Sequence, residues 1–517
     1  MTSKHIVNEY TKRKNDFMQH PPTLSYSLSL NLKNLQYRLS PNFDIIYREF
    51  DIPDFSRHAV LIYLKTITDV QMLQDYILRP LLQRSIKPKS KNANITVSTV
   101  TNRIELCDIQ IFSELDTIVS HLFAGSCILL LESMNIAFIL NTSKTMNRAI
   151  SEPTTESSIH GSKESFVEIL SINVSMLRRN FKSSHLSIQK SSIGVQTQRD
   201  VAVIYLDHLT NKKFVTAITE RICAIDIDDI LDNSCLEQLL SNNPYSPFPQ
   251  MIQTERPDRV IQGLLKGQVA VILDGSPFVL LTPITLALLL HTPEDDTERW
   301  WIGTTFRLLR LFCFLLALLL PALYITFISF HPGLIPWQLI IFIQSSRGGV
   351  PFSTFIETFI MACTIECLGE AGIRLPRSSG QAVGIVGGLV IGQSAVEAGL
   401  VSPVTVVIVA LTTLCSFAIP QYGLGLSIRL LRFLFIISAA IFGLYGIIFA
   451  FLFLCAHLVK LQNFGVNYLG YFVHYQSQDW KDTFIRLPIQ WNIFRNAIFK
   501  TQNRKRINLK KRKKGVQ

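Results

Sequence analysis

The sequence is poor in charged side chains. Only 17% of its 517 residues are Asp, Glu, Lys or Arg, against about 25% in an ordinary soluble domain. Apolar runs gather between about residues 305 and 460, and several of them are long enough to cross a lipid bilayer. We therefore expect a water-soluble N-terminal half followed by a membrane domain.

No signature of a known catalytic chemistry is present. The chain lacks the GxxxxGK[ST] phosphate loop, the HExxH zinc motif and the GxSxG nucleophile elbow. Its nine cysteines include no CxxC pair, and its histidines stand singly, so we expect no metal, no cofactor and no disulfide framework. The acidic group Asp226, Asp228 and Asp229 falls at an expected helix start, where carboxylates favour the helix dipole. We expect a protein that is not an enzyme.

We expect no secretory signal at the N-terminus. Residues 1–37 are polar and lack an apolar core. We expect them to be a flexible lead-in, and we expect the first half of the chain to stay in the cytoplasm.

The net charge of +12 is concentrated at the C-terminus. Ten Lys and Arg and no acidic residue lie from Arg495 onward, so 12 − 10 = +2 remains for the rest of the chain. A basic tail beside a membrane suits anionic lipid headgroups on the cytoplasmic side, although a solvated tail is an equally good interpretation. Because the basic charge is terminal, we expect no nucleic-acid partner.

The N-terminal half shows two groups of short apolar runs that alternate with helical periodicity, which is typical of small α/β subdomains. A stretch rich in Ser, Thr and Glu separates them. Arg178 and Arg179 near one helix C-terminus fit the helix dipole. The expected boundaries are a first subdomain at 38–145, a linker at 146–162, a second subdomain at 163–245 and a connector at 246–304.

The membrane domain, expected at 305–460 and followed by a C-terminal segment at 461–517, does not resolve into one topology. Arg307 and Arg310 precede the first long apolar run, which places that end in the cytoplasm. Four spans, the last at 430–458, keep the tail inside but place the pairs Arg374/Arg377 and Arg429/Arg432 outside. Five spans do the reverse. We favour a cytoplasmic tail, which leaves those arginines to pair with intramembrane carboxylates.

One part of the membrane domain resembles a re-entrant element. The apolar run 335–343 is too short to span, Gly348-Gly349 follows it, and then comes a helix that carries Glu357 and Glu366. Irregular backbone at membrane depth is tolerated only where it faces protein or water.

A glycine stripe follows. Gly380, Gly384, Gly388 and Gly392 recur every four residues, which places them on one face of a helix. Small residues allow another membrane helix to approach closely. The stripe therefore indicates either a helix-packing face or, with Gln393 and Glu397 beside it, the wall of a water-filled path.

Ionisable groups inside a membrane are candidates for function, and a ring of carboxylates in an oligomer favours cations. The candidate carboxylates of this membrane domain do not share one helix face, so some of them could instead form ion pairs with Arg347, Arg374 or Arg377. The candidate residues of an ion path or gate are Glu357, Glu366, Glu370, Gln393 and Glu397.

The sequence resembles the A-subunit family of GerA-type spore germinant receptors over about residues 35–490. Several phrases in the same order carry the resemblance, and one departure is Asp295-Asp296-Thr297, where the family tends to have Asp-Tyr-Tyr. The phrases are Glu152-Pro153, Lys163-Glu164-Ser165-Phe166-Val167-Glu168, Phe248-Pro249-Gln250, Thr254-Glu255-Arg256-Pro257-Asp258, Asp274-Gly275-Ser276-Pro277, Glu370-Ala371-Gly372-Ile373-Arg374-Leu375-Pro376, Val386-Gly387-Gly388-Leu389-Val390-Ile391-Gly392-Gln393 and Ala395-Val396-Glu397-Ala398-Gly399.

The resemblance implies a receptor subunit in the inner membrane of a bacterial endospore. Its implied partners are a multi-span B subunit thought to bind the nutrient, a lipoprotein C subunit and further copies of the A subunit in an oligomer proposed to be a nutrient-gated cation channel. Two alternatives stay open: a transporter-like solute carrier, and a scaffold of the receptor that conducts nothing.

Overall fold

The computed structural model describes residues 23–54, 57–83, 97–144, 153, 156, 161–374, 387–388, 390–473, 483–488 and 490–506. The chain divides into two compact units. The α/β unit consists of Met1–Leu240, Gln253–Pro283 and Phe499–Lys505, and the helical unit consists of Ser241–Ile252, Ile284–Ile498 and Arg506–Gln517.

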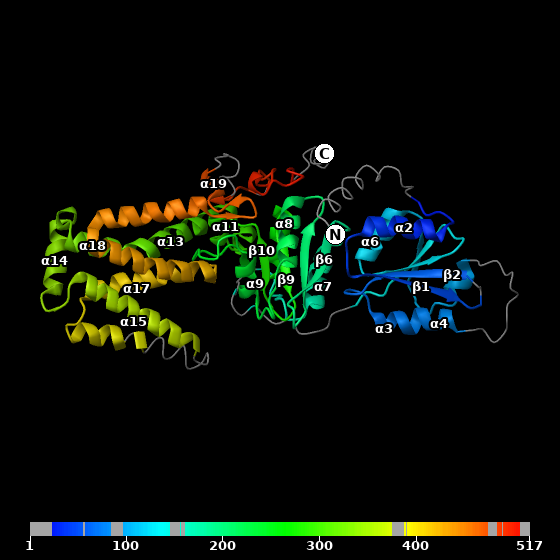
Figure 1. Cartoon of the computed structure of the whole chain (residues 1–517), viewed down its shortest axis with the longest axis horizontal. Coiled ribbons are helices and arrows are strands. Elements are labelled where there is room, and N and C mark those ends of the chain that lie inside the picture. Colours follow the sequence, from blue (N-terminus) through cyan, green and yellow to red (C-terminus); the bar gives the residue numbers. More distant parts are fainter. Residues whose placement is uncertain are drawn as a thin grey trace. The chain divides into compact units, whose positions relative to one another are not determined.

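The first subdomain of the α/β unit is an antiparallel sheet of order β1-β2-β4-β5-β3 between two helical layers. Figure 1 shows α2 and α6 on one face and α3 and α4 on the other, and each face has its own apolar core. The strands are β1 (Ile45–Ile52), β2 (Arg57–Leu64), β3 (Ile109–Phe112), β4 (Cys127–Leu131) and β5 (Ala137–Leu140), and the helices are α2 (Leu28–Leu39), α3 (Val70–Leu73), α4 (Arg79–Leu82), α5 (Val97–Thr101) and α6 (Leu115–Phe123).

The lead-in expected at 1–37 is shorter in the structure. Helix α2 lies within it and buries Leu35 and Leu39 in the core of the first subdomain. The apolar residues Leu28, Leu32, Leu35 and Leu39 follow helical spacing and pack against that core, which explains why the segment is ordered. Residues 1–22 lie outside the described part of the chain.

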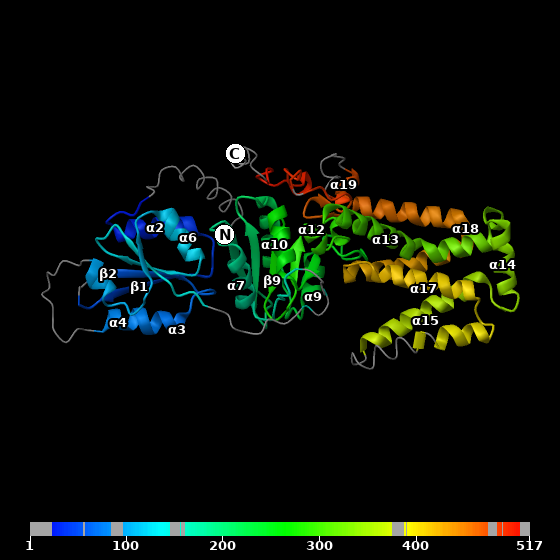
Figure 2. The same cartoon turned by 180° about the vertical axis from the view of Figure 1, so that it is seen from behind.

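The second subdomain is a sheet of order β6-β7-β9-β10-β8. Helices α7 and α10 touch each other and cover one face (Figure 2), while α8 and α9 cover the other. The elements are α7 (Leu170–Asn180), β6 (Leu186–Ile193), β7 (Arg199–Leu206), α8 (Lys212–Cys223), α9 (Asn233–Leu240), β8 (Ile252–Thr254), α10 (Pro257–Lys266), β9 (Val269–Leu273) and β10 (Val279–Thr282). The sheet therefore continues past the boundary expected at residue 245, because the proline-rich stretch interrupts this subdomain without ending it.

A buried ion pair joins the two subdomains. The guanidinium of Arg178 lies 3.0 Å from the carboxylate of Asp44, and both side chains are fully buried. Arg178 also donates to the Leu186 carbonyl oxygen at 2.8 Å and to Asn42 Oδ1 at 2.7 Å. Arg178 lies in the last turn of α7, as the dipole interpretation expects, but that interpretation missed the ion pair across the unit, which a buried charge requires.

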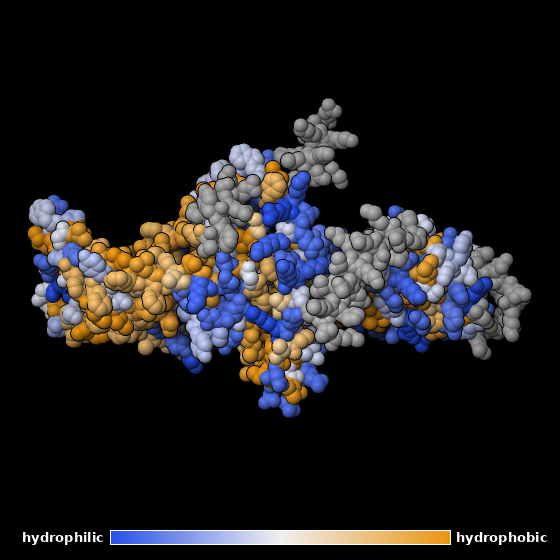
Figure 3. Space-filling model, turned by 45° about the horizontal axis from the view of Figure 1, so that its top comes forward, coloured by the Kyte–Doolittle hydropathy of each residue, from blue (hydrophilic) through white to orange (hydrophobic). Residues whose placement is uncertain are grey.

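The helical unit holds the apolar half of the chain. Two of its described helices, α13 and α18, are long and apolar enough to cross a membrane, and Figure 3 shows the visible face of this unit as mostly hydrophobic. Its elements are α11 (Leu286–Leu289), α12 (Glu294–Thr297), α13 (Trp300–Ser329), the 3₁₀ turn η2 (Pro332–Leu334), α14 (Trp337–Arg347), α15 (Thr354–Arg374), α17 (Pro403–Phe417), α18 (Tyr422–Lys460), β11 (Gln462–Asn463), β12 (Val466–Asn467) and α19 (Gly470–Val473).

Helix α18 is a hairpin of two helices that meet at Gly443, which has a non-helical φ of 58° and ψ of −133°. Ser427 bonds to Pro247 and His457 bonds to Ser246, although a straight helix would separate Ser427 from His457 by about 45 Å. The run expected to be one span at 430–458 therefore turns back on itself. With that correction, the predicted fold class is confirmed: two small α/β subdomains followed by an all-helical, multi-pass membrane domain.

Candidate functional site

Glu357 lies in a closed polar cluster where α14, α15 and α17 meet. Its side chain is fully buried, and the Arg347 guanidinium lies 3.5 Å from Glu357 Oε2. The backbone N–H of Ser402, at the start of α17, donates to Glu357 Oε1. The carboxylate thus neutralises Arg347 and satisfies one of the free N–H groups at a helix N-terminus.

The same cluster reaches α13 through hydroxyl groups. The Tyr324 hydroxyl lies 3.0 Å from Thr405 Oγ1, which in turn lies 3.1 Å from Ser402 Oγ. All three side chains are buried. Because polar groups are satisfied inside an apolar unit only by one another, this network holds four helices in one arrangement.

Glu366 forms a second ion cluster between α15 and α18. Its two carboxylate oxygens contact Arg429, at 3.0 Å, and Arg432. Arg432 is buried, whereas a quarter of the Glu366 side chain is exposed. One carboxylate faces two guanidinium groups from the first half of the α18 hairpin, so the cluster carries an excess positive charge.

Glu370 and Glu397 lie on the surface of the helical unit. Glu370 pairs with Arg374 one turn later at 2.7 Å, and both side chains are exposed. Glu397 accepts a hydrogen bond of 2.8 Å from Gln393 and is exposed. Among the described residues, Glu397 is the candidate carboxylate with no cationic partner. The structure thus separates the five candidates into three ion clusters and one exposed polar pair.

The glycine stripe is described only in part, since Gly380 and Gly384 lie outside the described residues. A Cβ at Gly388 would lie 3.8 Å from Leu368, and one at Gly392 would lie 3.8 Å from Val406, which are ordinary contacts. Gly387 is tighter, because its Cβ would meet Leu368 at 3.0 Å. The close approach to α15 thus falls one residue before the expected stripe.

Sequence reasoning missed an ion cluster at the base of α13. Asp295 is buried, and both of its oxygens accept hydrogen bonds from Arg310, at 2.6 and 2.7 Å. Arg307 lies 3.5 Å away. Burial alone would raise the pKa of Asp295, but the hydrogen bonds and charge of Arg310 hold that pKa below its usual value. The signal was present, since acidic residues stand shortly before the two arginines.

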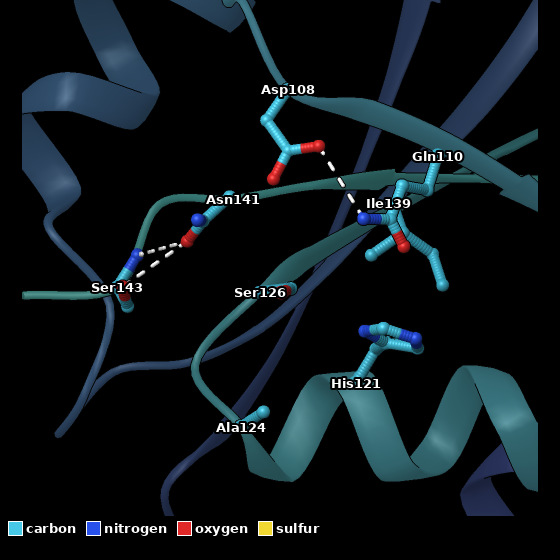
Figure 4. Close-up of a pocket in the computed structure, with 8 residues that line it drawn as sticks. All are labelled: Asp108, Gln110, His121, Ala124, Ser126, Ile139, Asn141 and Ser143. Atoms are coloured by element: carbon cyan, nitrogen blue, oxygen red, sulfur yellow. Dashed lines mark hydrogen bonds between the residues drawn. The ribbon is translucent and has the colours of Figure 1, made fainter.

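The α/β unit has a polar hollow of about 270 Å³ beside β3 and the end of α6. Figure 4 shows His121 facing it from α6, with Asp108 and Asn141 on the strand side. Asp108 bonds to Gln110 and Asn141 bonds to Ser143, so much of its lining is internally satisfied. Across the described residues, no group of three or more His, Cys, Asp and Glu could hold a metal ion.

Comparison with known proteins identifies the family. Residues 33–498 match the model of the Bacillus/Clostridium GerA spore germination protein. Spore germination protein GerLA of Bacillus cereus is 37% identical over 87% of this chain and 90% of its own length. Spore germination protein A1 of Bacillus subtilis is 40% identical over 77% of this chain and 82% of its own.

Among solved structures, the N-terminal domain of the A subunit of the Bacillus megaterium germinant receptor GerK3 is 28% identical, with a TM-score of 0.40, over 50% of this chain and 96% of that domain. The matches to the family model and to these relatives span most of the chain. This protein belongs to the GerA family of spore germination proteins, as an A subunit.

Proposed function

We propose that this A subunit forms the nutrient-gated, cation-conducting part of a spore germinant receptor as an oligomer of identical chains. The observation that carries the proposal is the exposed pair Gln393 and Glu397 on an apolar helical unit. A carboxylate at membrane depth requires water or another protein chain, and a ring of such groups attracts cations.

The five candidate residues divide by their contacts. Gln393, Glu397 and Glu370 are exposed and would line the path. Glu357 and Glu366 form ion pairs with arginines. We propose that they act as a gate, because breaking these ion pairs would change how α15 packs against its neighbours. Nutrient binding on a partner subunit would shift the equilibrium between two packing arrangements of the helix that carries the glycine stripe against α15.

The proposed partners are a multi-span B subunit that binds the nutrient, a lipoprotein C subunit and further copies of this chain. The proposed location is the inner membrane of the endospore, with the α/β unit in the cytoplasm. The basic tail from Lys510 to Lys514, which lies outside the described residues, would contact anionic lipid headgroups there.

The test compares potassium efflux from spores that carry the intact chain or Glu397→Gln. The trigger is a complete mixture of amino acids, sugars and nucleosides, and immunoblotting confirms equal abundance. Asp226→Asn, at an exposed position of the α/β unit, is the matched control. Lost or altered efflux in Glu397→Gln alone supports a place for this residue in the path.

Single-channel recording of the reconstituted receptor separates the alternatives. Unitary currents that depend on Glu397 support a channel. Solute movement in fixed stoichiometry without unitary currents would show a transporter. Absence of any flux, together with germination that is sensitive only to lesions of the α/β unit, would show a scaffold.

A further inference from the structure

The proline-rich segment Ser241–Ile252, which we call the strap, belongs to the helical unit, although the residues before and after it in the sequence belong to the α/β unit. The chain leaves the α/β unit after Leu240 at the end of α9, and it re-enters that unit at Gln253 within β8. The strap contains Phe248-Pro249-Gln250, a phrase for which the proposed ion path gives no role.

The strap contacts the first half of the α18 hairpin. The Ser427 hydroxyl donates to the carbonyl oxygen of Pro247, and Ser427 is buried. A Cβ at Gly423 would lie 3.5 Å from the Pro249 ring, so the strap packs directly on the first turn of this helix.

The strap also contacts the second half of the hairpin and the segment after it. Ser246 Oγ lies 2.9 Å from His457 Nε2, and the Tyr468 hydroxyl donates to the Pro249 carbonyl oxygen at 2.9 Å. The ring of Phe248 lies between, 6.2 Å from the ring of His457 and 6.1 Å from that of Tyr468.

Internal hydrogen bonds make the strap stiff. The buried amide of Gln250 accepts from the Asn242 N–H at 2.9 Å and donates to the Asn243 carbonyl oxygen at 2.6 Å. Asn463, in the strand after α18, donates to the Gln250 carbonyl oxygen. Prolines at 244, 247 and 249 further restrict the backbone, because each fixes φ near −65°.

We propose that the strap is the mechanical link through which the α/β unit acts on the α18 hairpin. This inference rests on the proposed gating only for what the hairpin then does. The strap is stiff, contacts both halves of the hairpin and is joined to the α/β unit at each end. A displacement of α9 or β8 is therefore transmitted to both halves of the hairpin together. Flexible residues added at either end of the strap would remove that transmission while leaving the contacts between the strap and the hairpin intact.

The test inserts Gly-Ser-Gly between Leu240 and Ser241, which adds slack and keeps every contact of the strap. The matched control inserts the same residues between Gln196 and Thr197, in the exposed turn between β6 and β7. We expect nutrient-triggered potassium efflux and loss of refractility to slow by about tenfold or more in the first variant, a usual size for coupling between two sites. The control should match the intact chain.

Wild-type response of the first variant at equal abundance would overturn the strap proposal, whatever the receptor conducts. The intact receptor could show no unitary currents while the insertion still keeps the spores refractile after nutrient addition. That result would support the strap proposal and contradict the proposed cation conduction. If the insertion lowers abundance, the double variant Ser427→Ala, Tyr468→Phe decides in its place. That variant removes two hydrogen bonds to the strap and keeps the aromatic ring at position 468. The same outcomes support or overturn the proposal.

Discussion

At the scale of single residues, burial decides what each carboxylate does. Glu357 is sealed between Arg347 and the N-terminus of α17. Glu357→Gln keeps an acceptor for the Ser402 N–H but leaves Arg347 without its counter-charge. We expect a loss of about 3 kcal/mol in stability, as when one partner of a buried ion pair is removed. The measurement is the thermal unfolding midpoint of the purified receptor.

Glu397→Gln is the control for that change, because it neutralises an exposed carboxylate of the same unit. Its unfolding midpoint should stay at the wild-type value. Equal midpoints for the two variants would show that Glu357 is not a structural partner of Arg347.

Asp295 makes a prediction about pH. Its pKa is lowered in the folded chain, so its contribution to stability is complete above the ordinary Asp pKa of about 3.9 and is lost as the pH falls through the lowered value. Asp295→Asn should therefore lower the unfolding midpoint at neutral pH, by about 3 kcal/mol in free energy. The deficit should shrink below about pH 4.

Unfolding midpoints of both proteins across that pH range check the prediction. Asp226→Asn, at an exposed position, controls for the loss of one negative charge. A deficit that is constant down to strong acid would contradict the assigned role of Asp295.

Ion pairing in the membrane half could largely be predicted from the sequence. An arginine inside an apolar run has few partners, so pairing with nearby carboxylates was one of the two interpretations that the sequence left open. The structure shows such pairs for Arg347, Arg374, Arg429 and Arg432, and Arg377 lies outside the described residues. The partner of each could not be assigned, because helix rotation and register depend on packing. Asp295 was missed although acidic residues stand shortly before the two arginines, because the sequence does not show that α12 folds back so that Asp295 meets Arg310.

At the scale of elements, Gly443 makes the α18 hairpin possible. Its backbone conformation is open mainly to glycine, and a Cβ there would lie 2.9 Å from the ring of Phe330. Gly443→Ala should therefore destabilise the helical unit by about 1–3 kcal/mol. Abundance in the spore membrane and the unfolding midpoint of the purified receptor measure the effect.

Gly425 offers a matched control in the same element. It lies in the first half of α18, and a Cβ there would meet nothing within 4 Å. Gly425→Ala should be neutral, or stabilising by up to about 1 kcal/mol from helix propensity. If both alanines behave alike, the turn at Gly443 does not depend on glycine.

Elements were predicted where periodicity was strong and missed where the decisive signal was local. The sequence around Gly443 is apolar on both sides, so hydropathy alone indicates one long span. Helix α2 was missed for another reason: its mean hydropathy is low, and only four leucines at helical spacing mark its buried face. Both cases show that a single glycine or a narrow stripe can outweigh average composition.

At the scale of the whole molecule, the hairpin suggests to us a topology for the membrane domain, which we put forward as a proposal. If α13, α15, the segment that contains the helix at 387–397, α17 and α18 each crossed once, these five crossings would keep the arginines of α15 and α18 near the cytoplasmic side but would leave the tail outside. Because α18 turns back at Gly443, we propose that its second half makes a sixth crossing, which would return the tail to the side of the arginines. The arginines at the start of α13, at the end of α15 and in the first half of α18 would then lie on the same side as the basic tail.

This arrangement predicts which positions a membrane-impermeant thiol reagent reaches. A cysteine at Tyr445, just after the turn and exposed, should be labelled from the side opposite to the tail. A cysteine at Tyr245 in the strap, also exposed, should be labelled only after the membrane is opened. Both are introduced into a chain whose nine native cysteines are replaced by serine or alanine and that still supports germination. Labelling of both from the same side would restore the single-span interpretation of α18 and with it the unresolved position of the tail.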